Sequence, residues 1–373
     1  MKFVREAARI LLGLTFVFSG FVKGVDPLGS TYKFIDYFTA FGTSWANSLA
    51  LILAILLSIA EFGIGAAILV NYRVKNVSWL ALIFMGFFLP LTLWIALENP
   101  VSDCGCFGDA IILSNWDTFY KNIVLTLLAA FIFTQRHKFR NHYNYSFQNG
   151  YFALVMLAFL FIQYYSYNHL PIFDFRPYKI GNSIIEGMEI PDDAPTDEYK
   201  TEFIYKNKQT GKEKMFTEEN YPWQDTLTWE YVSANSILVK EGYHPPIHDF
   251  TIENNYGEDV KDFYLYDDRY TFMLIAYNLE KASTKKQKSI NDFAQKALNE
   301  GMNFICLTAS TTSQIETFTA EHNPPYEIFF CDEITLKTIV RSNPGLMLTQ
   351  EGVILDKWHW RAFPKFEKAI KSK

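Results

Sequence analysis

The chain has 373 residues, of which 49% are hydrophobic and 17% aromatic, and its formal net charge is −6. Residues 1–169 carry eleven Lys and Arg against eight Asp and Glu, whereas residues 170–373 carry twenty-three against thirty-two. The acidic second part has no basic stripe, which argues against nucleic acid as a partner. We therefore predict a membrane domain followed by a soluble domain, each large enough for its own core.

Five apolar segments in the first part predict helices that span a lipid bilayer. Crossing about 30 Å of hydrocarbon takes roughly 20 residues. The segments are residues 7–22, 49–70, 77–97, 119–133 and 151–165, and only the second and third reach this length without flanking residues. The first segment also has features of a signal peptide, but no clear small-x-small cleavage site follows it and more spans come after.

Three basic clusters predict the orientation of these spans. The clusters lie at alternate connections and are formed by Lys2, Arg5 and Arg9, by Arg73 and Lys75, and by Arg136, Lys138 and Arg140. Cytoplasmic connections are rich in Lys and Arg. We therefore expect a protein of the bacterial inner membrane, with a cytoplasmic N-terminus and a periplasmic soluble domain.

The connection after the third apolar segment carries two of the four cysteines. Its sequence is Asp103-Cys104-Gly105-Cys106-Phe107-Gly108-Asp109. A glycine spacer allows two thiols to close into a small disulfide, and a strained ring of this kind is easily reduced. Because the periplasm permits disulfides, this stretch predicts a redox element at the outer membrane surface.

Glu61 lies in the middle of the second apolar segment. An ionisable group at that depth is costly, so we expect it to face the bundle interior with a partner, or with a proton to carry. The alternative is a purely structural carboxyl that hydrogen-bonds a neighbouring helix. Before this segment, the aromatic spacing from Tyr32 to Phe41 predicts a short helix in the outer interface.

These features together resemble the DoxX and MauE family over about residues 5–135. The resemblance rests on the stretch Ser19-Gly-Phe-Val-Lys-Gly-Val-Asp-Pro27, on Glu61 and on Cys104-Gly-Cys-Phe-Gly108. It implies a four-helix membrane domain associated with making disulfides in exported proteins. The arrangement is also similar to quinone-linked vitamin K epoxide reductases, which implies a quinone as electron acceptor. Those reductases have two residues between their cysteines, whereas this chain has one.

The second part begins with a β-rich connector. Residues 202–207 and 212–216 flank Lys208-Gln-Thr-Gly211, a pattern typical of a β-hairpin. We place the domain boundaries at 1–142 for the four-helix membrane domain, 143–170 for the fifth span, 171–242 for the connector and 243–373 for the last domain.

The last domain is predicted to contain an α/β sheet. Strands are expected at 270–277, 303–308, 326–330, 345–349 and 353–358, and helices at 285–300, 334–341 and from 363. This order resembles the thioredoxin-like fold, redoxin branch, with Pro344 at the position of that family's cis-proline. Where the family carries its redox pair, this chain has Asn278-Leu-Glu-Lys-Ala-Ser283. Without a cysteine there, the domain cannot perform that family's dithiol exchange.

The remaining candidate ligands and nucleophiles favour structural roles. Cys306 and Cys331 lie in apolar strands, where a free thiol behaves as a small hydrophobic side chain. His244 and His248 are four residues apart, but the prolines between them exclude a helix. We expect no metal site.

Two functions fit the sequence. In the first, Cys104 and Cys106 are the catalytic pair of a thiol-disulfide redox protein, Glu61 assists proton movement, and the soluble domain binds an exported client or a periplasmic redox partner. In the second, the chain is a non-enzymatic assembly factor in which Cys104 and Cys106 form a permanent staple. The ease with which the pair is reduced distinguishes them.

Overall fold

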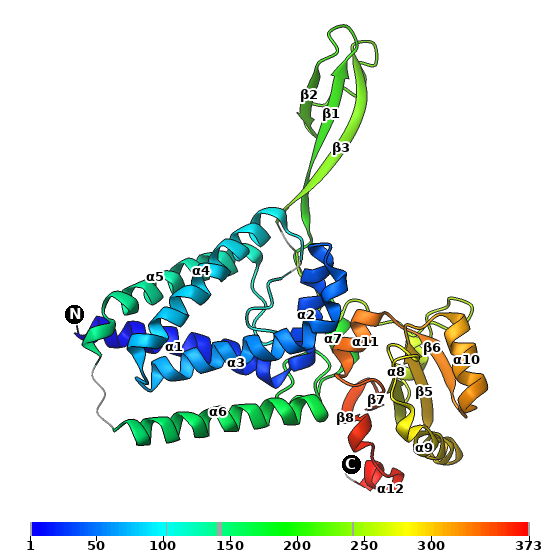
Figure 1. Cartoon of the computed structure of the whole chain (residues 1–373). Helices are drawn as coiled ribbons and strands as arrows, with labels where there is room; N and C mark the ends of the chain where they lie inside the picture. Colours follow the sequence, from blue (N-terminus) through cyan, green and yellow to red (C-terminus); the bar gives the residue numbers. More distant parts are fainter. Residues whose placement is uncertain (1, 102, 140–143, 241, 372–373) are drawn as a thin grey trace. The chain divides into compact units, whose positions relative to one another are not determined.

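The computed structural model describes residues 2–101, 103–139, 144–240 and 242–371. Arg140, which belongs to the third basic cluster of the sequence, lies outside the described residues. The chain forms two compact units, one of residues 1–182 with 251–373 and the other of residues 183–250. Figure 1 shows the helices and strands of both. The long apolar helices and the larger sheet therefore belong to the same unit.

Within the described residues, five helices have the length and composition to cross a membrane. They are α1 (Lys2–Val25), α3 (Ala50–Leu69), α4 (Val74–Glu98), α5 (Asn115–Thr134) and α6 (Tyr145–Asn168). The five predicted segments are confirmed as helices. Four of them extend beyond the apolar runs, because polar residues continue the helix at each end of α1, α4, α5 and α6.

The surface of these helices is apolar where it faces away from the bundle. On α4 the side chains of Leu80, Ile83 and Phe87 are 55%, 64% and 64% exposed. A continuous apolar surface of this kind is unfavourable in water and is typical of helices that face hydrocarbon. The chain is thus a membrane protein.

The helices α1, α3 and α6 run side by side (Figure 1). A small residue allows α1 and α3 to approach closely, since a Cβ atom on Gly20 would lie 2.4 Å from the backbone nitrogen of Phe62. Small residues are common at such helix interfaces in membranes. This close approach brings Ser19 and Lys23 of α1 against Glu61 of α3.

A short helix, α2 (Pro27–Ala40), follows α1 where the aromatic spacing predicts one. The Asp26 carboxylate caps it by accepting a hydrogen bond of 2.9 Å from the Gly29 N–H. Pro27 stands at the first helical position, where a missing N–H is tolerated. Beyond α2, the ring of Phe41 stacks on Trp94 of α4, with centroids 4.9 Å apart. The 3₁₀ helix η1 (Ser44–Leu49) then leads into α3.

A five-stranded sheet forms the core of the α/β part, with strand order β6-β5-β4-β7-β8. The strands are β4 (Thr271–Ile275), β5 (Asn303–Thr308), β6 (Glu327–Phe330), β7 (Gly345–Gln350) and β8 (Val353–His359). Parallel pairing joins β4, β5 and β6, whereas β7 and β8 pair antiparallel. All five predicted strands are confirmed, and the Asn343–Pro344 peptide bond is cis.

Helices accompany this sheet: α8 (Lys261–Leu265), α9 (Gln287–Asn299), α10 (Thr312–His322), α11 (Glu333–Ile339) and α12 (Phe366–Lys371). Single-turn 3₁₀ helices are η2 (Arg136–Lys138), η3 (Thr284–Lys286) and η4 (Trp360–Ala362). The sequence did not predict α10, which buries only Phe318 and therefore has no periodic apolar face. A capping box at Thr311 and Gln314 begins this helix.

The second unit contains a three-stranded antiparallel sheet of order β2-β1-β3. Its strands are β1 (Glu198–Asn207), β2 (Glu213–Thr217) and β3 (Trp229–Lys240), and the short helix α7 (Ile184–Met188) precedes them. The predicted hairpin is confirmed, with Gly211 at a φ of +69° in its turn. Most side chains of β3 are exposed, which explains why its sequence gave no strand signal.

Candidate functional site

The Cys104-Gly105-Cys106 stretch lies in the connection between α4 and α5. Gly105 has a φ of +65°, a region that favours glycine, and this conformation turns both cysteines to the same side. The two Sγ atoms are 3.0 Å apart, as free thiols. A disulfide bond measures about 2.05 Å, so a small rotation of the side chains would close it.

Helix α2 holds the first half of this connection. The Tyr37 hydroxyl donates a hydrogen bond of 2.8 Å to the Cys104 carbonyl. The Lys33 ammonium contacts the Asp103 carboxylate at 2.6 Å, and that carboxylate accepts from the Gly105 N–H at 2.8 Å. The interfacial helix therefore positions the backbone on which both thiols sit.

A buried ion pair holds the second half. The Lys23 Nζ atom lies 2.8 Å from Glu61 Oε2, and the two residues are only 7% and 6% exposed. Lys23 also donates to Ser19 Oγ and to the Cys106 carbonyl, so its three N–H groups have three acceptors. Ser19 Oγ lies 2.9 Å from Glu61 Oε2 and 2.7 Å from the Cys106 carbonyl, and its single proton serves one of them at a time. Glu61 thus faces the bundle interior with partners, as the sequence predicts.

The surroundings of the two thiols shift their pKa values in opposite directions. The hydrogen bond between the two Sγ atoms lowers the pKa of Cys106 below its ordinary value, against the effect of burial. The charges of Lys121 and Lys23 act in the same direction, and Glu61 opposes them. The same hydrogen bond, together with burial, raises the pKa of Cys104. Cys106 is therefore the more acidic thiol of the pair.

An apolar cavity of about 490 Å³ lies beside the thiol pair. Both cysteines, Lys23 and Glu61 line one part of it, and the rest of its wall is aromatic and aliphatic, including Phe34, Phe38, Leu53, Leu57, Phe88 and Leu91. Leu56 and Phe87 also line it and are 55% and 64% exposed on the apolar surface of the bundle. The cavity thus adjoins the lipid-facing side and has a volume typical of small-molecule sites.

The other two cysteines are not among the residues that line this cavity. Cys306 is 0% and Cys331 is 5% exposed, and burial raises the pKa of each to about 12. In the other unit, His244 Nε2 lies 3.4 Å from the Asp197 carboxylate and His248 Nε2 lies 2.9 Å from that of Asp249.

Several site residues were not assigned a role from the sequence. Ser19 and Lys23 were noted only as part of the stretch on which the family resemblance rests. Because they are four positions apart, they lie on one face of α1. Tyr37 lies within the predicted interfacial helix but was not assigned to its aromatic face. Lys121, whose ammonium lies 4.2 Å from the centre of the Phe107 ring, gave no signal beyond its charge.

Comparison with known proteins covers two parts of the chain. Residues 199–241 match a family model described as a domain of unknown function, DUF8463. No curated protein matches the chain. Residues 1–135, which contain the thiol pair, the buried ion pair and four of the membrane helices, match the family model described as methylamine utilisation protein MauE.

Proposed function

We propose that the chain is a membrane-anchored thiol-disulfide redox protein that oxidises thiols of exported proteins through Cys104 and Cys106. The observation that carries this proposal is the arrangement of the pair: two free thiols 3.0 Å apart, one with a lowered pKa, at the edge of an apolar cavity. Reactivity of a cysteine follows thiolate character and access. Cys104 and Cys106 both line a cavity that adjoins the surface of the described helices, whereas Cys306 and Cys331 are 0% and 5% exposed.

The first half-reaction transfers a disulfide to the client. A client thiolate attacks the Cys104 sulfur of the closed pair, which forms a mixed disulfide and releases Cys106 as the thiolate. Cys106 is the better leaving group because the thiol with the lower pKa leaves faster. A second client thiolate then displaces Cys104. The client loses two electrons and two protons, and the pair becomes a dithiol.

The second half-reaction returns the pair to its disulfide and requires a two-electron acceptor. We assign this role to a quinone, because the cavity is apolar, adjoins the lipid-facing surface and is lined by both cysteines. The dithiol loses two electrons and two protons, the quinone becomes a quinol, and the disulfide forms again. The quinone is here a substrate dissolved in the membrane.

Glu61 and Lys23 would handle one of these protons. Their contact with the Cys106 carbonyl and with Ser19 forms a polar path inside an apolar bundle. When the Glu61 carboxylate accepts the proton of the Cys106 thiol, the new thiolate replaces it as the negative charge near the Lys23 ammonium, so that no single charge stays buried. Glu61 is therefore the proposed acid-base residue, and Lys23 holds its charge.

The α/β part would supply the binding surface for the client or for a periplasmic partner. Three parallel strands followed by an antiparallel pair, with Pro344 before β7, support a thioredoxin-like fold. Leu279 and Ser283 lie on the segment where the related family carries its redox pair, and this segment has no cysteine. Binding and chemistry would thus be divided between the two parts.

The basic residues support an N-terminus in the cytoplasm of a bacterium, with the thiol pair on the periplasmic side. Arg9 donates to the carbonyl of Ile68 at the end of α3, and the Arg5 guanidinium lies 5.3 Å from the ring of Phe139. Arg73 lies 3.4 Å from Asn149 on α6. The described basic clusters therefore gather at one end of the bundle, as positive charges at a cytoplasmic face do.

A second candidate function is a non-enzymatic assembly factor with a permanent Cys104–Cys106 staple. The observation that favours it is burial, since Cys104 is only 9% exposed and its carbonyl is tied to Tyr37. A staple of this kind would fix the connection without exchanging electrons.

The experiment that distinguishes the two functions uses the purified full chain in detergent. The reduced chain is mixed with a short-chain ubiquinone, and quinol formation is followed by absorbance. The redox function predicts one quinol per chain, with none in Cys104→Ser or Cys106→Ser and an unchanged yield in the control Cys306→Ala. No quinol from the reduced wild type would reject the quinone step.

A further inference from the structure

Arg341 connects the α/β part to the connection that carries the thiols. It lies between α11 and β7, and its side chain is 6% exposed. Its Nε atom donates to Asp26 Oδ2 at 2.8 Å, and its Nη2 atom donates to Asp109 Oδ2 at 2.9 Å. The remaining nitrogen, Nη1, donates to the Lys337 carbonyl. One guanidinium thus joins two carboxylates that are 83 positions apart in the sequence.

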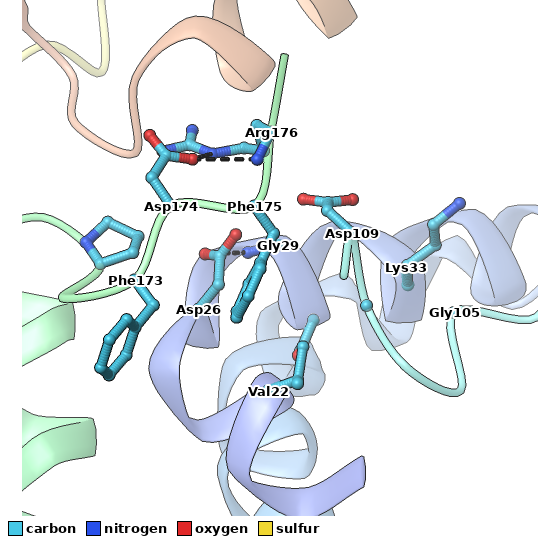
Figure 2. Close-up of a pocket in the computed structure, with 13 residues that line it drawn as sticks. Val22, Asp26, Gly29, Lys33, Gly105, Asp109, Phe173, Asp174, Phe175 and Arg176 are labelled. Atoms are coloured by element: carbon cyan, nitrogen blue, oxygen red, sulfur yellow. Dashed lines mark hydrogen bonds and ion pairs between the residues drawn. The ribbon is translucent and has the colours of Figure 1, made fainter. Parts of the chain in front are cut away.

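Each carboxylate belongs to an element that positions the thiols. Asp26 is the N-cap of α2, the helix whose Tyr37 binds the Cys104 carbonyl. Asp109 lies three positions after Cys106 in the connection itself. Figure 2 shows Asp26 bonded to the Gly29 N–H, with Asp109 in the same pocket. A substitution of Arg341 would therefore disturb both α2, which holds Cys104, and the connection that follows Cys106.

The geometry requires an arginine. A guanidinium presents donors in a rigid fork and can serve two carboxylates at once, whereas a lysine ammonium is a single point charge. The Arg341 guanidinium also lies 5.3 Å from the ring centre of Tyr32 on α2. Burial alone raises the pKa of Asp26, but the charges of Arg341 and Arg176, together with the Gly29 N–H, outweigh burial and lower it.

We propose that Arg341 is a positioning residue for the thiol pair, through which the α/β part sets the geometry of Cys104 and Cys106. The inference rests on the proposed function for its consequence. By holding Asp109, Arg341 keeps Cys106 close to the groups that face it: Cys104 in the connection, Lys121 on α5, Lys23 on α1, Glu61 on α3 and Tyr37 on α2. When the contact between Arg341 and Asp109 is lost, Cys106 should move away from some of these groups.

The test measures how fast Cys106 in the reduced full chain reacts with iodoacetamide as pH is varied, in membranes, with peptide mass spectrometry as the readout. Arg341→Gln should shift the midpoint of the Cys106 profile upward by about one pH unit, which lowers its rate roughly tenfold at pH values well below the midpoint, because reaction follows the thiolate fraction. Arg341→Lys keeps the positive charge but not the fork of donors, so its Cys106 midpoint should lie between those of the wild type and Arg341→Gln.

Two variants disturb the same contact from the membrane side. Asp109→Asn removes one carboxylate charge, and its effect should not add to that of Arg341→Gln. In Gly29→Ala the new Cβ atom would lie 2.5 Å from Asp26 Oδ2 and 2.8 Å from Arg341 Nη2, which forces the contact apart. The matched control is Gly86→Ala on α4, where no atom lies within 4 Å of the new Cβ.

The inference is overturned if Arg341→Gln and Gly29→Ala keep the wild-type midpoint while the α/β part resists protease as in the wild type. Should Arg341→Gln fail to fold, Gly29→Ala and Asp109→Asn decide the outcome. Alkylation does not depend on a client or an acceptor. A shifted midpoint in a chain that forms no quinol would therefore uphold the positioning role and reject the quinone step of the proposed function.

Discussion

The buried pair of Lys23 and Glu61 gives the sharpest stability prediction. Its atoms are 2.8 Å apart inside the bundle, and both residues are less than a tenth exposed. Removing one partner leaves an uncompensated buried charge, which costs about 3–5 kcal/mol. Lys23→Met should therefore lower the free energy of unfolding by about this amount, since it also removes the hydrogen bonds from Lys23 to Ser19 Oγ and to the Cys106 carbonyl.

The double variant Lys23→Met/Glu61→Leu separates stability from chemistry. Replacing both charges with apolar side chains is often nearly neutral, so it should recover at least about 2 kcal/mol relative to Lys23→Met. The assay is unfolding of the purified chain by SDS titration in mixed micelles. The control is Lys75→Met, because Lys75 is exposed at the start of α4. The reasoning is refuted if Lys23→Met and Lys75→Met unfold within about 1 kcal/mol of each other. A stable double variant that no longer forms quinol would assign the pair a chemical role.

Further predictions concern the cysteines, Glu61 and the topology. In the wild type, Cys106 should be alkylated with a midpoint below the ordinary thiol value of about 8.5, because its folded pKa is lowered and the thiolate persists at lower pH. Cys306 and Cys331 should stay unreactive until the chain unfolds; labelling under native conditions would contradict this. Glu61→Gln keeps the shape but removes the titrating proton, so a relay predicts lost quinol formation in a folded chain. Reporter fusions after Lys138 should lie in the cytoplasm and fusions after Tyr178 in the periplasm.

The membrane helices could be predicted because the features that determine them lie within each segment of the sequence. Apolar length predicted the helices, and the depth of Glu61 in its segment predicted an interior position with a partner. The identity of that partner was not local. Lys23 lies near the end of α1, where a lysine ordinarily extends to the interface, and only the close packing of α1 on α3 turns it toward Glu61.

Contacts between residues far apart in the chain could not be predicted from the sequence. Arg341 ended a predicted helix and carried no other signal, yet it meets Asp26 across 315 positions. Such a pair depends on how α11 and the end of α1 are brought together, which no periodicity encodes. The helix α10 was missed for a different reason, because its exposed polar sequence lacks the apolar repeat on which such predictions depend.

Thiol trapping in intact cells tests the central claim most directly. Cells that express the full chain are acid-quenched with and without a mild reductant, and the state of Cys104 and Cys106 is determined by alkylation. The redox function predicts a mixture of dithiol and disulfide that shifts with the reductant, and a loss of client disulfides in Cys104→Ser. A pair that stays fully oxidised under reduction, or a Cys104→Ser chain with normal client disulfides, would contradict it and favour the staple.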